Sequence, residues 1–467
     1  MRLRATVAAL WTLIGVSVWG CASSPAARGA LGAAGLISVG VAEVDITPTE
    51  AIRLTGYGNR EQPTDDVRQR LWARALAFGD DGRASVLIAV DLIGVPRALT
   101  EEVARRLGNT VRREQFVISA THTHTGPALA GVLPYIFNLP ASAPQQRVID
   151  SYTSALAGQL ERVARAALAD RRPARVSWSQ GRAGFAANRR VITDGKWTGF
   201  GVTPGGAVDH DLPMLAVHGT DGALRAVFVN YACHATTLEA RDNFVHGDWP
   251  GVAKELIQQR HPGALALVAI GTGADANPNP RGGGLPDVQR NAAAVADEVD
   301  RLLAAPMRPL TEPPKGRLAT IDLQLAALPA RQQWEEQALK KTPEGFQAQA
   351  ILARLDRGER VATSTPYPIQ AWSFGDSLGM VFLAGEVVAD YGLRLKRELD
   401  PSRLWVNAYS NDVAFYVASR RLIPEGGYEV DRSMVFYGQP ARLAGDTEDR
   451  IISTVRTLLP RSFASRR

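Results

Sequence analysis

Short apolar runs alternate with helical patterns along the chain from about residue 40 onward. Residues 85–92 (SVLIAVDL) and 115–120 (QFVISA) are predicted as buried strands, because each is a short run rich in β-branched side chains. The segment between them, TEEVARRL at 100–107, has the spacing of an amphipathic helix. Together the three segments predict a β-α-β unit with two parallel strands.

The same alternation continues to the end of the chain. The polar helical stretch at 331–356 is predicted to cover part of the surface. Further strands are expected at 225–231, 265–270, 380–385 and 404–409, and further helices at 146–169, 250–260, 287–305 and 387–399. We therefore predict an α/β layered domain with a mixed, largely parallel sheet.

The two ends of the chain differ from this body. Residues 1–20, MRLR followed by an apolar run, have the form of a signal peptide, and they lead to Cys21 in a Val-Trp-Gly-Cys pattern that resembles a bacterial lipobox. An ordinary signal peptide with an incidental cysteine is the alternative. The small-residue stretch at 21–38 is predicted as a flexible tether. We expect an exported protein held in the bacterial cell envelope by lipid on Cys21, or otherwise a periplasmic or secreted one.

The body itself is predicted to be one catalytic domain over residues 39–460, with a basic tail at 461–467. A proline-rich connector at 306–316 divides it, because proline continues neither a helix nor a central strand.

Composition excludes several classes of protein. With 467 residues, 45% of them hydrophobic and 21% charged, the chain is long and apolar enough to bury a large core. The net charge is +6, but five arginines lie within the first four and the last seven residues, so no basic patch indicates nucleic acid as a partner. The two cysteines, Cys21 and Cys233, exclude a disulfide scaffold and a CxxC metal site. Cys233 is expected to be a buried thiol.

Side chains that could react follow the predicted strands directly. In open α/β sheets the ligand crevice lies outside the carboxyl ends of the strands, so an active site is predicted there. The residues concerned are Asp91, His122 and His124 in THTHTGP, His234, Asp275 and Asn277 in ADANPN, and Glu386.

Imidazole and carboxylate groups at these positions favour a metal site. If the backbone stays extended beyond the strand, His122 and His124 lie on the same side and reach one ion or its water. His234 and Glu386 complete a set that suits one Zn²⁺ and leaves a position for water. Paired histidines in a turn have a structural role about as often as they bind a metal, so the HxH pattern alone does not establish a metal site. Of the other histidines, His210, His218 and His261 are interpreted as surface, second-layer or structural residues, and His246 stays undecided.

A serine hydrolase is the competing interpretation. GDSLG at 375–379 matches the GxSxG pattern, with Ser377 as the nucleophile. A nucleophile elbow needs a strand, a sharp turn and then a helix, whereas strand-like runs flank GDSLG on both sides. The pattern therefore favours a hairpin turn at this position.

Seven segments in order resemble the catalytic domain of the neutral/alkaline non-lysosomal ceramidases, from about residue 39 to about residue 437. They are GVAEVDITP, GYG, RLWARALAF, VISATHTHTGP, NYACHATTL, HGDWPG and LAGE. The resemblance implies hydrolysis of the amide bond of N-acylsphingosines with a single zinc ion. It implies His122, His234, Glu386 and Tyr416 as zinc ligands, Tyr428 as a donor to the substrate carbonyl, and Arg189 as a second donor, with the neighbouring Arg190 as the alternative.

Two departures from the family pattern matter. Asn277 stands where the family has a serine, which favours a metal-activated water as the nucleophile. The family also has a further C-terminal β-sandwich domain, and this chain stops soon after the catalytic part.

The resulting hypothesis is a zinc-dependent hydrolase of a lipid or other N-acyl amide. His124 is expected to take and return the proton, and Asp91, Asp248 and Asn277 are expected to support the site from outside the ligand set. A catalytically silent, surface-anchored binding protein is a third possible class.

Overall fold

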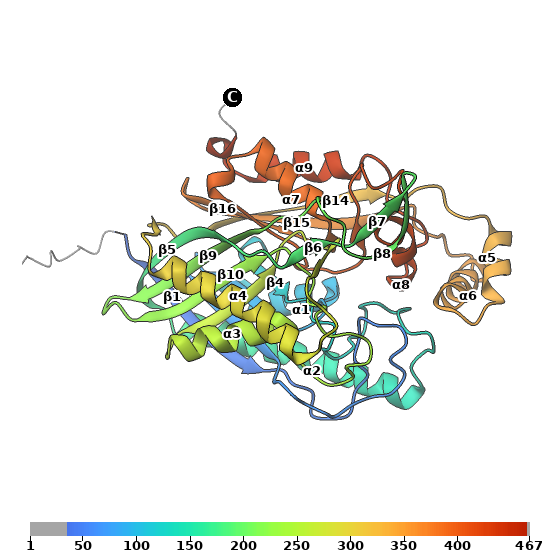
Figure 1. Cartoon of the computed structure of the whole chain (residues 1–467), viewed down its shortest axis with the longest axis horizontal. Coiled ribbons are helices and arrows are strands. Elements are labelled where there is room, and N and C mark those ends of the chain that lie inside the picture. Colours follow the sequence, from blue (N-terminus) through green and yellow to red (C-terminus); the bar gives the residue numbers. More distant parts are fainter. Residues whose placement is uncertain (1–34, 465–467) are drawn as a thin grey trace, which may run out of the picture. The chain divides into compact units, whose positions relative to one another are not determined.

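A computed structural model describes residues 35–464 of the chain. Within them, two β-sheets lie face to face and helices cover both outer faces (Figure 1). The large sheet consists of β1 (Ile37–Asp45), β2 (Trp72–Phe78), β3 (Ser85–Val90), β4 (Phe116–Ala120), β5 (Arg172–Arg182), β9 (Asp211–Gly219), β10 (Leu224–Tyr231), β11 (Leu265–Ile270) and the short β13 (Arg308–Leu310). Their order is β11-β10-β9-β5-β1-β2-β3-β4, with β13 beside β5.

The mixed α/β architecture is confirmed, but the sheet is not largely parallel. Among the described strands of the large sheet only β3–β4 and β10–β11 pair in parallel, and the other pairs are antiparallel. The connections explain the difference. A helix, α1 (Arg97–Leu107) or α3 (Asp248–Arg260), lies between the strands of each parallel pair, whereas short turns join β2 to β3 and β9 to β10.

The second sheet has the order β14-β15-β16-β18 and packs on the large sheet through a shared apolar core. Its strands are β14 (Lys315–Gln324), β15 (Ser364–Phe374), β16 (Leu378–Leu383) and β18 (Leu404–Asn407). Large aromatic side chains fill the space between the sheets. Phe228 of β10 stacks on Trp405 of β18 with ring centroids 4.9 Å apart. Such aromatic burial contributes to the apolar core between the two sheets.

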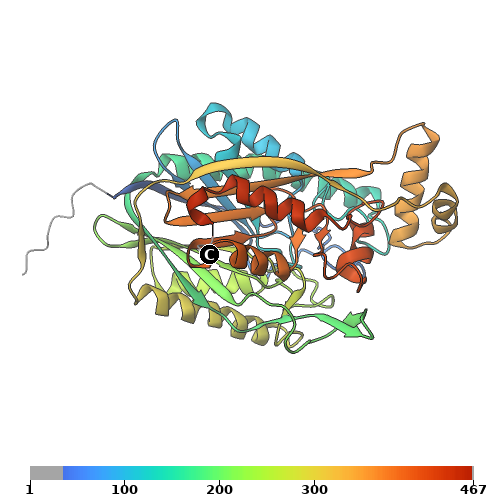
Figure 2. The same cartoon turned by 90° about the horizontal axis from the view of Figure 1, so that it is seen from above.

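Helices cover the outer faces. The long α2 (Ala143–Ala169) packs on β1 and β2, while α3 and α4 (Leu285–Leu303) cover the β5–β11 side. On the opposite face, α9 (Thr447–Leu458) lies across the second sheet, with α7 (Ala389–Glu398) beside it (Figure 2). The predicted stretch at 331–356 forms two helices, α5 (Arg331–Ala338) and α6 (Pro343–Asp356), because the Thr342 side chain caps a new helix.

The large sheet curves so that its two edge strands, β4 and β11, lie close to each other. The chain after β18 joins them by backbone hydrogen bonds. Ala408 N–H donates to Ile270 O at 2.9 Å, and Ala120 N–H donates to Tyr409 O at 3.1 Å. This closure brings the carboxyl ends of β4, β10, β11 and β16 to one place, although β4 and β10 are far apart in the strand order.

Several predictions concern the chain ends and the connector. The signal peptide at 1–20, Cys21 and most of the 21–38 tether lie outside the described residues, and β1 begins at Ile37. Within the predicted basic tail at 461–467, residues 461–463 form a 3₁₀ turn that buries Phe463. The 306–316 connector contains β13, which lies along β5 and holds a proline. Within residues 35–464, no helix is long and apolar enough to cross a membrane.

Candidate metal centre and active site

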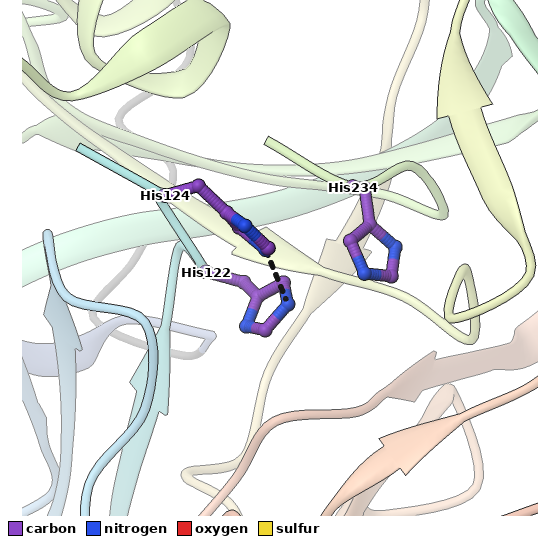
Figure 3. Close-up of side chains that lie close together, drawn as sticks. All are labelled: His122, His124 and His234. Carbon is purple, nitrogen blue, oxygen red and sulfur yellow. Dashed lines mark hydrogen bonds between the residues drawn. The ribbon is translucent and has the colours of Figure 1, made fainter. Parts of the chain in front are cut away.

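Three imidazole rings converge where the strands end, as Figure 3 shows. His122 and His124 follow β4, and His234 follows β10; the Nε2 atoms of His122 and His124 lie 3.2 Å apart. The expectation of an extended HxH segment is wrong. His122 has a φ of 56°, in the left-handed region that non-glycine residues seldom adopt, and it is the backbone turn at this residue that aims both rings inward.

In each ring the hydrogen bond of Nδ1, which faces away from the site, determines whether Nε2, which faces into it, carries a proton. Each Nδ1 lies within hydrogen-bond distance of a backbone carbonyl, which only accepts, so each Nδ1 carries the proton and each Nε2 presents a lone pair. The contacts are His122 Nδ1 to Ile93 O at 2.6 Å, His124 Nδ1 to Gly56 O at 3.2 Å and His234 Nδ1 to Gly273 O at 2.9 Å. Burial, together with the Arg189 guanidinium, lowers the pKa of His234 to about 3, so this ring is neutral at pH 7.

Glu386 faces these nitrogens from a short two-stranded sheet. It lies in β17 (Glu386–Val387), directly after β16, and its Oε2 is 3.1 Å from Nε2 of both His122 and His234. Among the described residues this buried oxygen has no hydrogen-bond partner. A carboxylate oxygen facing two lone pairs is unfavourable unless a cation lies between them. The donor set of two imidazoles and a carboxylate therefore fits a metal ion such as Zn²⁺.

Tyr416 occupies the fourth position predicted for a ligand. It lies in β19 (Tyr416–Val417), which pairs in parallel with β17 so that Tyr416 is opposite Glu386. Its hydroxyl is 3.3 Å from His234 Nε2 and accepts a hydrogen bond from Arg189 Nη2 at 3.1 Å. Burial raises the pKa of Tyr416 well above its ordinary value, so the phenol keeps its proton unless a cation is bound beside it.

The structure distinguishes the two neighbouring arginines. Arg189 Nη1 lies 3.3 Å from His234 Nε2, and its Nε donates to Glu429 Oε1 at 2.8 Å. Arg190 instead points away from the histidines, to the carboxylates of Glu425 and Glu429 and to a backbone carbonyl. The arginine that faces the site is therefore Arg189.

Tyr428 lies at the outer side of this group, in the short π-helical turn Tyr428–Arg432. Its ring centroid is 5.4 Å from that of Tyr416, and the Arg189 guanidinium lies 5.6 Å from its ring centroid. Unlike Tyr416, it is only half-buried. Tyr428 therefore lies beside Tyr416 and Arg189 at this side of the group.

Of the three residues expected to support the ligands, only Asn277 contacts a residue of the site. Its Oδ1 accepts from Arg189 Nη1 and from Thr236 Oγ1, both at 3.3 Å. Backbone carbonyls hold the three imidazoles, and the supporting roles expected for Asp91 and Asp248 stay predictions. Asp91 forms a buried ion pair with Lys254 and accepts from Trp72 N–H and Thr121 Oγ1, and Asp248 accepts from the backbone N–H groups of Leu238 and Trp249.

The remaining sequence candidates lie away from the site chemistry. Asp275 accepts from Ala389 N–H and Asn188 Nδ2, and so joins two segments of the site. His246 accepts from Asp248 N–H through Nδ1, and His261 pairs with Asp300. Cys233 is a buried free thiol, as predicted, and burial raises its pKa well above the ordinary value.

Ser377 lies in a hairpin turn, as the flanking strands predicted. Phe374 pairs with Leu378 across the turn between β15 and β16, and Ser377 is exposed. Glu386 follows the opposite end of β16. The strand-turn-helix context that a nucleophilic serine requires is therefore missing at Ser377.

Tyr437, which follows α8 (Ser433–Phe436), contacts the site although no sequence pattern indicated it. Its hydroxyl donates to Glu386 Oε1, so the two oxygens of this carboxylate have different surroundings. Local sequence spacing holds no signal for this contact, because 51 residues separate the partners and the contact depends on the fold.

Residues 37–279 match the family described as neutral/alkaline non-lysosomal ceramidase, N-terminal. The match covers more than half of the chain. The chain belongs to this family. The matched residues include His122, His124, Arg189 and His234, whereas Glu386 and the three tyrosines of the site lie beyond them.

Relatives and solved structures agree with this membership. The neutral ceramidase of Mycobacterium tuberculosis is 30% identical over 236 residues, which are 47% of this chain and 35% of the relative. The neutral ceramidase of Pseudomonas aeruginosa is 25% identical over 251 residues, 51% of this chain and 37% of the relative. The alignments thus span little more than a third of these relatives. A crystal structure of the Pseudomonas aeruginosa enzyme shares the fold, with a TM-score of 0.69 at 17% identity, over 91% of this chain and 74% of that one.

Proposed function

We propose that the chain is a zinc-dependent hydrolase that cleaves the amide bond of an N-acylsphingosine or a related lipid amide. The observation that carries the proposal is the buried Oε2 of Glu386, which faces the lone pairs of His122 and His234 without a hydrogen-bond partner among the described residues. Family membership and relatives named neutral ceramidases support the substrate class.

His122, His234, Glu386 and Tyr416 are the proposed metal ligands. A zinc ion held by these residues would supply Lewis-acid chemistry, because it would polarise a carbonyl and lower the pKa of water toward neutrality. Tyr437 holds the other oxygen of Glu386 and thereby fixes which one faces the imidazoles.

His124 is proposed as the group that moves the proton. Burial, together with the neighbouring imidazoles, lowers its pKa well below the ordinary value, so its Nε2 carries no proton at pH 7. It is also less buried than His122 and His234. From this position, His124 Nε2 takes a proton from the attacking water and returns it to the leaving amine nitrogen.

Arg189 and Tyr428 are proposed to stabilise the oxyanion that develops on the substrate carbonyl. The Arg189 guanidinium lies 5.6 Å from the Tyr428 ring centroid, and the ion pair with Glu429 holds Arg189 in place. Donors of this kind are worth roughly 3–4 kcal/mol each in comparable hydrolases. Asn277 Oδ1 accepts from Arg189 and Thr236, and its amide is no nucleophile, which supports water in that role.

The test compares metal content and amide hydrolysis in three variants of the full chain. His122→Ala and His234→Ala should each lose the metal and the hydrolysis of N-acylsphingosine, and Ser377→Ala should keep both. Loss of activity in Ser377→Ala alone would show a serine hydrolase. A wild-type protein that binds zinc and turns over no N-acyl amide would instead be the silent binding protein.

Export and lipid attachment at Cys21 stay proposals, because these residues lie outside the described part of the chain. Labelling with a radioactive fatty acid in the native cell would test them. Cys21→Ser should abolish the label, and Cys233→Ser should not.

A further inference from the structure

A β-hairpin begins directly after Arg189 and lies beside the site. Its strands are β7 (Arg190–Thr193) and β8 (Lys196–Phe200), next to α8 in Figure 1. Asp194 and Gly195 form the turn with φ values of 50° and 72°, and two positive φ values mark a two-residue type I′ turn. The hairpin thus has a tight turn and one irregularity, between Val191 and Ile192, and it is joined to a residue that reaches the imidazoles.

The hairpin and the two residues after it carry an unusual share of the exposed apolar surface. Of the seven large hydrophobic side chains that are exposed in the described part of the chain, three fall within residues 192–202. Ile192 is 37%, Phe200 50% and Val202 56% exposed. Single exposed hydrophobic residues are normal on a protein surface, but a cluster beside a candidate active site indicates a binding surface.

Contacts with the neighbouring loop hold the hairpin in place. Trp197 N–H donates to Glu425 O at 3.0 Å, and Lys196 Nζ donates to Pro424 O at 2.8 Å. Trp197 also packs on Gly427, where an added Cβ would lie 2.4 Å from the indole. Phe200 and Val202 are therefore exposed on an anchored element.

Phe200 connects this apolar surface with the proposed oxyanion donors. Its ring centroid lies 5.0 Å from that of Tyr428, and the Arg189 guanidinium lies 4.9 Å from the Phe200 centroid. One face of the ring thus packs on residues proposed to bind the carbonyl, while half of the side chain faces solvent. A hydrocarbon chain attached to that carbonyl would pass over this surface on leaving the site.

We propose that Phe200 and Val202 form a binding surface for a long hydrocarbon arm of the substrate. The assignment of that substrate as a lipid amide rests on the proposed function. Apolar contact with a chain stabilises long substrates more than short ones, because each buried methylene adds to the binding free energy. The hairpin would therefore set chain-length preference and take no part in the bond cleavage itself.

The first test is the ratio of kcat/KM for long against short substrates in detergent-free solution. One series varies the N-acyl group from acetyl to dodecanoyl on a fixed amine, and a second varies the amine chain on a fixed acyl group. Phe200→Ser and Val202→Ser should each lower the long-to-short ratio by about tenfold in at least one series. Leu339→Ser, which removes an exposed hydrophobic side chain outside this surface, should leave the ratio unchanged.

A second test does not depend on turnover. The Trp197 ring lies 5.4 Å from Phe200, so a long-chain fatty amide brominated along its chain should quench the emission of Trp197. The quenching should be lost in Trp197→Phe and weakened in Val202→Ser. Wild-type protein that cleaves no amide in either series would contradict the proposed function, and the quenching would then decide this inference on its own.

Three results would overturn the inference. The first is an unchanged long-to-short ratio in both variants and both series. The second is turnover without any quenching that depends on Trp197. The third is a loss of binding to phosphatidylcholine vesicles in Phe200→Ser and Val202→Ser with the ratio unchanged, which would show that the surface contacts a bilayer instead of the substrate chain.

Discussion

The Nε2 atoms of His122 and His124 lie 3.2 Å apart. One residue separates the two histidines, and the backbone at His122 is not extended. Both atoms present lone pairs, so the two rings cannot satisfy each other without a proton or a cation. Glu386 Oε2 lies against His122, whereas His124 is the more accessible ring. On this difference rests the proposal that His122 is a metal ligand and His124 a proton carrier.

His124→Ala should therefore retain the metal and lose activity. We expect kcat to fall by about 10²–10⁴-fold, because general acid-base groups contribute that much. Metal content per chain and single-turnover rates measure the two effects. His218→Ala, on strand β9, serves as the control. Loss of the metal in His124→Ala would show that this ring is a ligand.

Tyr437→Phe should weaken metal binding without removing any proposed ligand. The tyrosine hydroxyl donates to Glu386 Oε1, and loss of such an outer contact costs about 10–100-fold in metal affinity. Competition with a fluorescent chelator measures the affinity. Tyr152→Phe, which removes a hydroxyl bonded to the Ile46 carbonyl, is the matched control. Equal affinity in the two variants would contradict the role of Tyr437.

Arg189→Lys and Arg190→Lys should differ, although the residues are neighbours. Lysine cannot contact Tyr416 and Glu429 together as Arg189 does, so kcat/KM should fall by about 10²–10³-fold with the metal retained. Arg190 contacts Glu425 and Glu429, so its substitution should lower thermal stability and leave kcat nearly unchanged. The reverse pattern would mean that the site arginine is Arg190.

Asp248→Asn should change the pH dependence of stability and leave metal binding intact. Burial raises the pKa of Asp248 from 3.8 to about 6 in the folded chain, so the folded state holds a proton that the unfolded state releases. The stabilisation that comes from this bound proton is fully present below about pH 4 and is lost as the pH rises through about 6. From pH 4 to 7 the free energy of unfolding of wild type relative to Asp248→Asn should fall by about 1–3 kcal/mol.

Urea unfolding at several pH values measures this difference, with exposed Asp65→Asn as the control. A difference that does not vary with pH would contradict the burial argument. Metal loss in Asp248→Asn would instead support the role expected for it from the sequence.

Hydrophobic patterning predicted the elements and the location of the site. The strand predicted at 265–270 has the observed bounds of β11, and the predicted helix at 250–260 begins two residues late. Site residues follow strands because the carboxyl ends of strands leave side chains in a crevice. That rule identified His122, His234 and Glu386 as members of one site.

The pairing of strands could not be predicted in the same way. The apolar run of β9 indicates a buried strand but not its direction, which short turns to its neighbours determine. The approach of β4 to β11 depends on the segment 408–411, and hydrogen bonds from distant strands hold Tyr409 and Asn411 at positive φ. His122 is turned in the same way. Such conformations are imposed by tertiary contacts, which local sequence does not reveal.

The most direct test of the account is removal and return of zinc in the full-length protein. Chelation should abolish hydrolysis of N-acylsphingosine, and activity should return in proportion to added Zn²⁺, up to about one ion per chain. His122→Ala should neither retain the ion nor regain activity. Full activity in protein shown by mass spectrometry to be free of metal would contradict the account.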